Sequence, residues 1–315
     1  MSTLKHVLEV IDLLDDPKVN GDAVRRFFTS RGFTDIKIDV ETIRGEKGST
    51  DFITIVIPGK EGKTLGGSSP TLGVVGRLGG IGARPAYIGM VSDADGAIVA
   101  LATAYKIAEM RVRGDVLPGD VIITTHICPN APTRPHKPVP MMDSPVNIFT
   151  LLKWEVRDEM DAVLSVDATK ANWVIKHTGF AITPTVKEGW ILRVSPDLTD
   201  IYVRVTGEPP VIVPITMQDI LPYSTPVYHI NSMMQPWLYT KAPVVGVAIT
   251  ARMALPGSGT GPTNFVALEQ ATRFVVEVAK DFTMGRARFY DPQEWETIIK
   301  MHGPVADVLR KGIPE

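Results

Sequence analysis

Hydrophobic residues recur along the chain at two alternating spacings. Apolar side chains three and four positions apart predict helices, and alternating or short unbroken apolar runs predict strands. Helical spacing occurs at 4–14, 20–28, 97–110, 198–205, 265–282 and from 291 onward. Strand-like runs occur at 36–43, 53–57, 72–75, 121–125, 162–166, 180–186, 190–194 and 244–249, and the runs at 180–186 and 190–194 are expected to pair across residues 187–189. This order of elements predicts an α/β protein with a mostly parallel sheet wrapped by helices.

The strand runs differ in how they are expected to be covered. Residues 36–43 alternate apolar and polar side chains, which indicates a strand with one exposed face. The runs at 121–125 and 162–166 are almost entirely apolar or lack charge, as expected of strands buried on both faces. We find no internal repeat and no low-complexity linker. We therefore expect one domain over residues 1–315, with the N-terminal helices and strands of residues 1–60 packing on the main sheet.

Composition and charge narrow the class of protein. The 315 residues are 44% hydrophobic and 22% charged, which is ordinary for a globular protein. A formal net charge of -2 gives no basis for binding nucleic acid. No apolar run approaches the ~18 residues that cross a bilayer, and the N-terminus lacks a signal-peptide core. Because Cys128 is the single cysteine, an internal disulfide is excluded. These features predict a cytoplasmic protein with no membrane or nucleic-acid partner.

Two carboxylates, Asp93 and Asp95, lie where a loop turns into the helix expected at 97–110. Ligand sites in open α/β sheets collect at the carboxyl ends of strands, next to such loops. Carboxylates there can bind a divalent metal or transfer protons. The alternative is that they cap the following helix, since Asp is favoured at helix N-termini. Both can hold if one Asp caps and the other faces the site.

Two strand ends carry further candidates. His126 follows the strand at 121–125 and is either a metal ligand or general base, or a hydrogen-bonded core histidine. Asp167 ends a buried strand, the usual position of an active-site carboxylate, although it can instead cap a turn. Lys170 either neutralises a substrate charge or is a solvated surface lysine.

Two arginines in the segment that follows the strand at 72–75, and one histidine, are further candidates. The glycine-rich segment 76–84 contains Arg77 and Arg84. Its backbone N–H groups and a guanidinium can hold an anion such as a substrate carboxylate; the alternative is a tight turn with surface arginines. His229 either caps a helix or faces the site. The apolar residues 233–239 belong either to the core or to a contact between copies of the chain.

Three segments together resemble an uncharacterised bacterial and archaeal family of unknown function (DUF1177-like). They are Glu46–Phe52, Gly76–Pro85 and Thr124–His136. The resemblance extends over nearly the whole chain and implies no established activity.

A more distant likeness is to the di-zinc aminopeptidases. Residues 93–110 resemble the Asp-Asp-x-x-x-Gly loop and helix of those enzymes, and 121–128 are similar to their strand that ends in a Glu-Glu pair. Residues 161–167 look like their strand ending in a ligand Asp, and 243–263 like their final strand and loop. The resemblance implies a three-layer, zinc-peptidase-like α/β/α fold of the phosphorylase/hydrolase-like type.

The same resemblance implies roles for three residues. Asp93 takes the place of the metal-bridging Asp, His126 that of the general-base or ligand glutamates, and Asp167 that of a terminal ligand. Three family positions differ. The His-x-Asp motif falls on residues 77–79, the Glu-Glu pair on 125–126, and the last histidine on 256–257, and these positions lack the family's ligands.

The leading hypothesis is a metal-dependent hydrolase of an amide or peptide-like small molecule derived from amino acids. A divalent metal, zinc in the family it resembles, would polarise the carbonyl and lower the pKa of a bound water. In this hypothesis His126 and Asp95 are catalytic, Arg77, Arg84 and Lys170 bind the substrate, and Asp93, His126, Asp167 and His229 bind the metal.

Two alternative hypotheses assign the protein to other functional classes. One is a non-catalytic small-molecule-binding or regulatory protein that kept the fold and lost the metal. The other is a lyase or isomerase of amino-acid-derived acids that uses His126 or Lys170 as its base. In each case we expect a homo-oligomer, because related peptidase folds often assemble.

Overall fold

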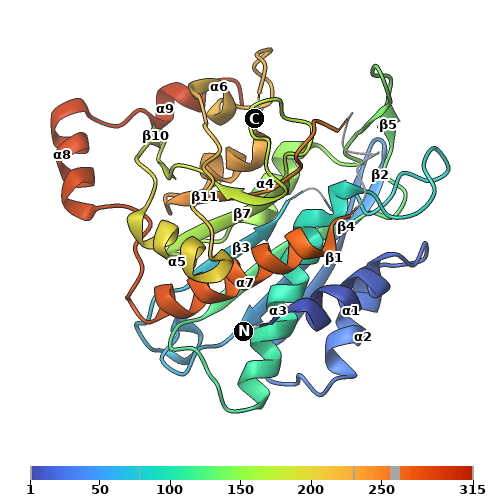
Figure 1. Cartoon of the computed structure of the whole chain (residues 1–315), viewed down its shortest axis with the longest axis horizontal. Helices are drawn as coiled ribbons and strands as arrows, with labels where there is room; N and C mark the ends of the chain where they lie inside the picture. Colours follow the sequence, from blue (N-terminus) through green and yellow to red (C-terminus); the bar gives the residue numbers. More distant parts are fainter. Residues whose placement is uncertain (1, 78, 230, 256–262, 314–315) are drawn as a thin grey trace.

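The structure is a computed structural model that describes residues 2–77, 79–229, 231–255 and 263–313 (Figure 1). Its centre is a mixed sheet of nine strands. The strands are β1 (Lys37–Gly45), β2 (Gly48–Ile57), β3 (Leu72–Gly76), β4 (Val121–Ile127), β7 (Ala162–Ala168), β8 (Gly179–Ile182), β9 (Val186–Lys187), β10 (Trp190–Ile191) and β11 (Val244–Thr250). A separate two-stranded ribbon joins β5 (Thr133–Arg134) to β6 (Met141–Met142).

The strand order is β1-β2-β4-β3-β7-β11-β9-β10, with β8 also paired to β11. The four central strands β4, β3, β7 and β11 run parallel, and both edges of the sheet are antiparallel. The carboxyl ends of the central strands therefore meet along one edge of the sheet, where ligand sites of open α/β sheets lie.

Helices cover both faces of the sheet, which confirms the three-layer α/β/α fold. On one face lie α1 (Leu4–Leu14), α2 (Gly21–Thr29), α3 (Asp95–Val112), α5 (Pro196–Thr206) and α7 (Phe265–Thr283). On the other lie α4 (Ile148–Glu155), α6 (Met217–Ile220) and the 3-10 helix η3 (Ser232–Tyr239). Two short 3-10 helices are η1 (Lys63–Leu65) and η2 (Ser92–Ala94); α8 (Pro292–His302) and α9 (Ala306–Leu309) end the described chain.

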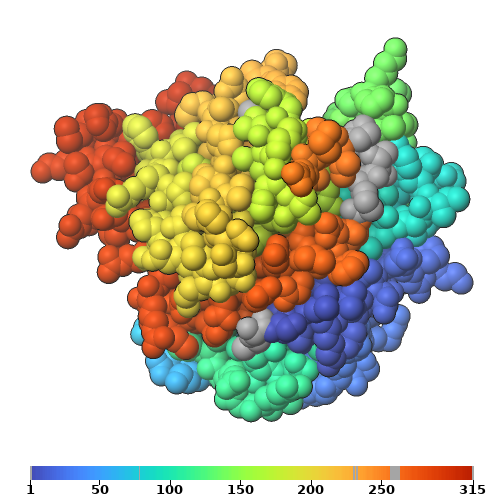
Figure 2. Space-filling view, viewed as in Figure 1, coloured from blue at the N-terminus to red at the C-terminus, as the bar shows by residue number. Residues whose placement is uncertain are grey.

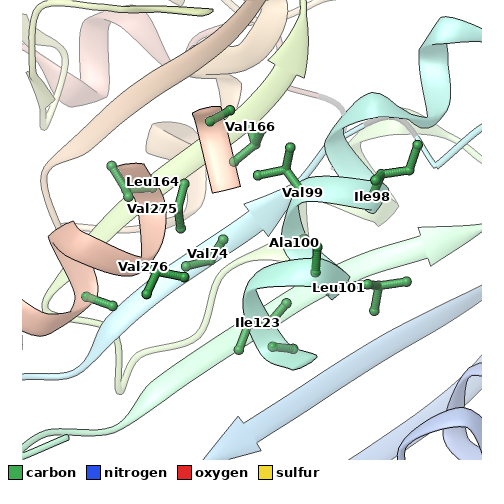
Figure 3. Packing of buried hydrophobic residues seen from close by; sticks show 14 of the residues in the cluster. Val74, Ile98, Val99, Ala100, Leu101, Ile123, Leu164, Val166, Val275 and Val276 are labelled. Carbon is green, nitrogen blue, oxygen red and sulfur yellow. The ribbon is translucent and has the colours of Figure 1, made fainter. Parts of the chain in front are cut away.

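Helix α3 is buried on almost every side, because it lies between the sheet and the helices α1 and α7. Figure 3 shows Val99 of α3 near Val166 of the sheet, and Val275 and Val276 of α7 near Val74 and Leu164. A helix that is apolar all round is expected where both of its faces are covered. No helix in the described ranges is long and apolar enough to span a membrane.

One predicted hairpin is confirmed only in part. The runs at 180–186 and 190–194 were expected to pair with each other, but β8 pairs antiparallel with β11, and only β9 and β10 pair together, over two residues each. Pro184 lies between β8 and β9 and has no N–H for a ladder, which divides the first run into two strands.

The apolar residues 233–239 belong to the core. Trp237 is fully buried, and its indole N–H donates to the Ile220 carbonyl at 2.8 Å. Met233 and Met234 are buried under the sheet beside it. The sequence leaves open whether this segment belongs to the core or to a contact between copies of the chain, and in the structure it packs in the core.

Candidate functional site

The predicted strand-end residues meet at the carboxyl end of the parallel strands. Arg77 directly follows β3, and Asp167 lies near the end of β7. The two strands are parallel neighbours, with Gly76 opposite Val166, and the Arg77 N–H donates to the Val166 carbonyl at 2.9 Å. The side chains that follow these two strands therefore start from adjacent points of the backbone.

Gly96 brings the start of α3 onto these strand ends. A Cβ at this position would lie 2.4 Å from the Arg77 carbonyl oxygen and 2.6 Å from that of Val166. Both obstacles are backbone atoms, which cannot rotate away. The absence of a side chain at Gly96 therefore lets Asp93, in η2, and Asp95, the first residue of α3, reach the strand ends.

We expect Gly96→Ala to lower the free energy of unfolding by about 2 kcal/mol. Alanine favours a helix over glycine by ~1 kcal/mol, but forcing an extra methyl into a packed core costs about 1–3 kcal/mol or more. Because the methyl would meet two fixed carbonyls, the packing cost should prevail. Urea denaturation tests this; a variant more stable than the parent would mean that α3 does not press on the strand ends.

Asp95 and Lys170 form a buried ion pair. The Lys170 ammonium lies 2.5 Å from the Asp95 carboxylate, and the side chains are 5% and 0% exposed. Burial raises the pKa of Asp95 to about 6, against the opposing effect of Lys170. Lys170 is thus no solvated surface lysine. Ala94 is the N-cap residue of α3, so neither predicted Asp occupies that capping position.

Asp93 and Asp167 are two buried carboxyls that repel each other. Burial, then the charges of Asp167 and Asp95, raise the pKa of Asp93 well above its usual range, while Arg77 opposes the shift. Burial raises the pKa of Asp167 to about 7, although Arg77 and the Ala168 N–H, 2.7 Å from its Oδ1, favour its charged form. Neither carboxyl forms an ion pair with a described residue, so no paired cation holds either one in its charged form.

Gly80 leaves room beside the Asp93 carboxyl. A Cβ at Gly80 would lie 2.8 Å from Asp93 Oδ2 and 2.5 Å from the Met142 methyl. Asp93 itself remains 8% exposed, whereas Asp95 is fully buried. The carboxyl of Asp93 is thus the more accessible of the two that precede α3.

Arg77 is fully buried and already has partners. Its Nη1 lies 3.0 Å from Glu155 Oε2, and its Nη2 donates to the Tyr223 hydroxyl at 3.1 Å. Burial would lower the pKa of Arg77, but the charge of Glu155 and other neighbours raises it overall. Arg77 therefore supplies a permanent positive charge to the site, and its contacts differ from the predicted pairing with a substrate carboxylate.

Both ring nitrogens of His126 are occupied. Nε2 accepts the Gly79 backbone N–H at 3.1 Å, and Nδ1 lies 3.0 Å from the Thr50 hydroxyl, which donates to the Ile127 carbonyl at 3.0 Å. An N–H cannot accept, so this network assigns a neutral ring with its proton on Nδ1. Burial, together with the charge of Arg77, lowers the pKa of His126 to about 4. These contacts correspond to the core histidine of the two sequence interpretations.

We expect nuclear magnetic resonance to find His126 neutral, with its proton on Nδ1, down to about pH 4. Its folded pKa is depressed below the ordinary 6.5, so the unfolded chain binds the proton first as the pH falls. The stabilisation from the neutral ring is therefore complete above about pH 6.5 and is lost towards pH 4. Titration of this ring near pH 6.5 would contradict the network.

The side chains of Arg84 and His229 contact backbone carbonyls rather than the carboxyls of Asp93, Asp95 and Asp167. The Arg84 guanidinium donates to the Pro129 carbonyl at 3.0 Å and is partly buried. His229 Nε2 lies 3.3 Å from the Leu221 carbonyl oxygen, and its ring centre is 5.8 Å from that of Tyr223. The structure thus brings together Asp93, Asp95, Asp167, Lys170 and Arg77. His229 lies beside Tyr223, the hydrogen-bond partner of Arg77, and Arg84 contacts the Pro129 carbonyl.

The side chains at this site do not fit a catalytic zinc of the usual kind, which has three protein ligands. Within the described residues there is no group of three or more His, Cys, Asp or Glu side chains placed to hold a metal ion. The nitrogens of His126 are taken, and Asp95 is paired with Lys170. The predicted set of Asp93, His126, Asp167 and His229 as metal ligands stays a prediction.

Comparison with known proteins connects this arrangement to a family. The profile of a family described as "Protein of unknown function (DUF1177)" matches residues 41–312. The chain belongs to this family. No curated protein matches the DUF1177 chain.

Among solved structures, the DUF1177 chain is similar to the Legionella pneumophila LapA aminopeptidase. The TM-score is 0.51 and the identity 10%, over 91% of this chain and 72% of that one. At this identity the likeness concerns the fold alone. Both resemblances drawn from the sequence, to the family and to an aminopeptidase-like fold, are confirmed.

Two residues of the DUF1177 site were not anticipated from the sequence. Glu155 ends α4 and is 1% exposed, and Tyr223 lies between α6 and η3. A carboxylate at the end of the apolar helix 148–155 is a usable signal for Glu155, since such a residue is seldom buried without a partner. We find no local signal for Tyr223.

Proposed function

We propose that this protein hydrolyses an amide or peptide-like small molecule with Asp93 and Asp167 as its acid–base pair. The observation that supports this most is the electrostatic coupling of two buried carboxyls at the strand ends, with both pKa values raised. Carboxyls whose environments separate their pKa values can act as acid and base near neutral pH. Since they interact, the pair titrates as a unit.

The reaction needs one proton on the pair. Asp93, with the more strongly raised pKa, keeps the proton, and Asp167, with a pKa of about 7, is partly ionised at neutral pH. Asp167 removes a proton from a water that attacks the amide carbon, and Asp93 protonates the carbonyl oxygen. Collapse of the tetrahedral intermediate breaks the C–N bond; the amine leaves with the proton held by Asp167, and the oxygen returns its proton to Asp93.

The neighbouring charges fit this assignment. Asp95 is paired with Lys170, and Arg77 with Glu155, so each of these buried charges has a compensating partner. Arg77 also lowers the pKa of both Asp93 and Asp167, which keeps the pair within reach of neutral pH. For a carboxylate on the substrate we propose Arg84 as the candidate cation, since Lys170 is already paired with Asp95 and Arg84 contacts only the Pro129 carbonyl among the hydrogen bonds of the described residues.

The test is a screen of dipeptides, aminoacyl amides and N-acyl amino acids for released amine, with elemental analysis of untagged protein. We expect at least one amide to be cleaved, turnover that survives a strong chelator, and less than one tenth of a metal ion per chain. Binding without turnover, seen as a raised melting temperature, would replace the proposal with the non-catalytic class.

A metal-dependent hydrolase is the second candidate, favoured by the same two coupled carboxyls, because oxygen ligands suit a divalent ion. About one metal ion per chain in the parent and none in Asp93→Asn would establish it and overturn the metal-free proposal. Equal metal content in both proteins would place any metal elsewhere.

A further inference from the structure

The carboxyl cluster consists of Asp93, Asp95 and Asp167. A cavity of about 550 Å³ lies at the opposite end of α7 from this cluster. Helix α7 ends beside Gly119, just before β4 begins, since a Cβ at Gly119 would lie 3.2 Å from the Thr283 Cβ. The end of α7 is therefore at the amino end of the parallel strands, away from the carboxyl ends where the cluster lies, and the residues that follow α7 line the cavity. At 1.5 Å per residue, the 19 residues of α7 extend about 28 Å. The cavity is therefore separate from the proposed active site.

Helix α8 forms one wall of this cavity and projects from the body of the molecule, at the left of Figures 1 and 2. None of its residues is fully buried. The opposite walls are β10, the segment that follows it, the start of α5 and the segment after α7. A volume of this size lies within the range of ~300–1000 Å³ that is usual for small-molecule sites.

Arg193, Arg286 and Arg288 line the cavity, and only Arg193 forms an ion pair with another described residue. Arg193 lies 3.3 Å from Glu294 and 3.7 Å from Asp291. In the ranges that the structure describes, no carboxylate forms an ion pair with Arg286 or Arg288, and both are exposed. These two guanidiniums are available to an incoming anion.

The acidic residues of the cavity are engaged. Asp197 accepts the backbone N–H of Arg288 at 2.7 Å, and Asp291 accepts two N–H groups at the start of α8. Glu294 is the ion-pair partner of Arg193. The positive charge of Arg288 reaches Asp291, whose pKa it helps to lower, without forming an ion pair. Outside its ion pairs, the described lining therefore carries two positive charges, Arg286 and Arg288, against the one negative charge of Asp197.

The rest of the lining is apolar and aromatic, and its rings are held in place. Trp295 and Tyr290 pack edge to face with centres 6.4 Å apart. The Lys187 ammonium lies 5.0 Å from the centre of the Trp295 ring and 5.4 Å from that of Tyr290. Ile298 and Leu192 extend the apolar surface. A wall of this kind can cover the body of a ligand whose charged end meets the arginines.

We propose that this cavity binds a small organic anion, a carboxylate or a phosphate monoester attached to an aromatic or aliphatic body. The guanidiniums of Arg286 and Arg288 bind the anionic group, since arginine recognises carboxylate and phosphate oxygens in bidentate fashion. Trp295 and Tyr290 cover the apolar part. This site does not depend on the proposed hydrolase activity.

Isothermal titration calorimetry on the full chain tests the proposal with four probes: phenyl phosphate, 3-phenylpropionate, 3-phenylpropanol and inorganic phosphate. We expect at least one ring-bearing anion to bind, and the alcohol and inorganic phosphate to bind at least ten times more weakly. The better of the two anions identifies the anionic group. The double variant Arg286→Ala/Arg288→Ala should bind that anion at least tenfold more weakly, because it loses the charged hydrogen bonds that hold the anionic group.

Three further variants make the assay specific. Trp295→Leu should weaken the ring-bearing anion at least fivefold, and Arg26→Ala, which removes an exposed arginine on α2, should leave binding unchanged. Asp93→Asn should also bind normally. Loss of binding in Asp93→Asn would place the anion in the carboxyl cluster and overturn the proposal.

Three other results would also overturn it. They are no binding of either ring-bearing anion at 10 mM, unchanged binding in the double arginine variant, and a dimer in sedimentation experiments that Trp295→Leu dissociates. The last result would make the cavity a contact between two copies of the chain. None of these outcomes depends on an active enzyme, so they are distinguishable from a failure of the proposed function.

Discussion

Asp93→Asn should lower kcat on the amide substrate by about 10²–10⁴-fold, the usual contribution of a positioned acid or base. The amide of asparagine keeps the shape of the carboxyl but can neither hold nor return the proton. Folding should be unaffected or improved, since the charged form of Asp93 is disfavoured where it lies, as its raised pKa indicates. The expected result is a well-folded and nearly inactive protein.

The measurement is initial-rate kinetics together with thermal unfolding of parent and variant. Asp12→Asn is a matched control, because it makes the same chemical change at an exposed position on α1. Asp12→Asn should keep full activity. If Asp93→Asn retains the kcat of the parent, Asp93 is no acid or base of the reaction and the site assignment fails.

Three carboxyls of the site, unlike that of Glu155, could be predicted from the sequence because their signals are local. Asp167 follows an unbroken buried run, and Asp93 and Asp95 precede a strongly apolar helix. What the sequence left open were the partners. Whether Asp95 caps a helix or meets Lys170 depends on how two loops 75 positions apart approach each other. Local periodicity carries no information about that approach.

His126 is a clearer example of side-chain partners that local sequence patterns do not predict. The sequence leaves His126 open between a catalytic and a core role, and its ring contacts two residues distant in sequence, Thr50 at 76 positions and Gly79 at 47. The register of β2 on β4, which sets Asp51 opposite Ile127 and Phe52 opposite His126, brings Thr50 near the ring. The strands themselves were predictable, but their order in the sheet was not.

Arg77 changes what the carboxyl cluster can do. The aminopeptidase motif that the sequence resembles would have a metal ligand at this position, and the chain has a guanidinium held by Glu155 and Tyr223. A guanidinium contributes a fixed positive charge, but unlike a metal ligand it cannot help to hold an ion that activates a water molecule. The pKa values of Asp93 and Asp167 are raised by burial, and the charge of Arg77 limits this rise. For this reason we propose a reaction that depends on proton transfer by the two carboxyls.

Arg77→Met should lower the free energy of unfolding by about 3–5 kcal/mol, the usual cost of leaving one member of a buried ion pair alone. The Glu155 carboxylate would remain 1% exposed with its cation gone. The double variant Arg77→Met/Glu155→Leu should recover most of this loss, since replacing a whole buried pair by apolar residues is often close to neutral. Urea denaturation of the parent, both single variants and the double variant gives the coupling energy.

An exposed ion pair of similar length makes the control for this cycle. Arg25 lies 2.8 Å from Asp22 on α2, against 3.0 Å for Arg77 and Glu155, but its side chains are 41% and 62% exposed. Arg25→Met should therefore cost no more than about 1 kcal/mol, because water screens the charges and solvates whichever one remains. The contrast isolates burial, since distance and residue type are nearly the same. If Arg77→Met were as mild as Arg25→Met, water would have to reach Glu155, and the cluster could not hold the raised carboxyl pKa values on which the proposed chemistry depends.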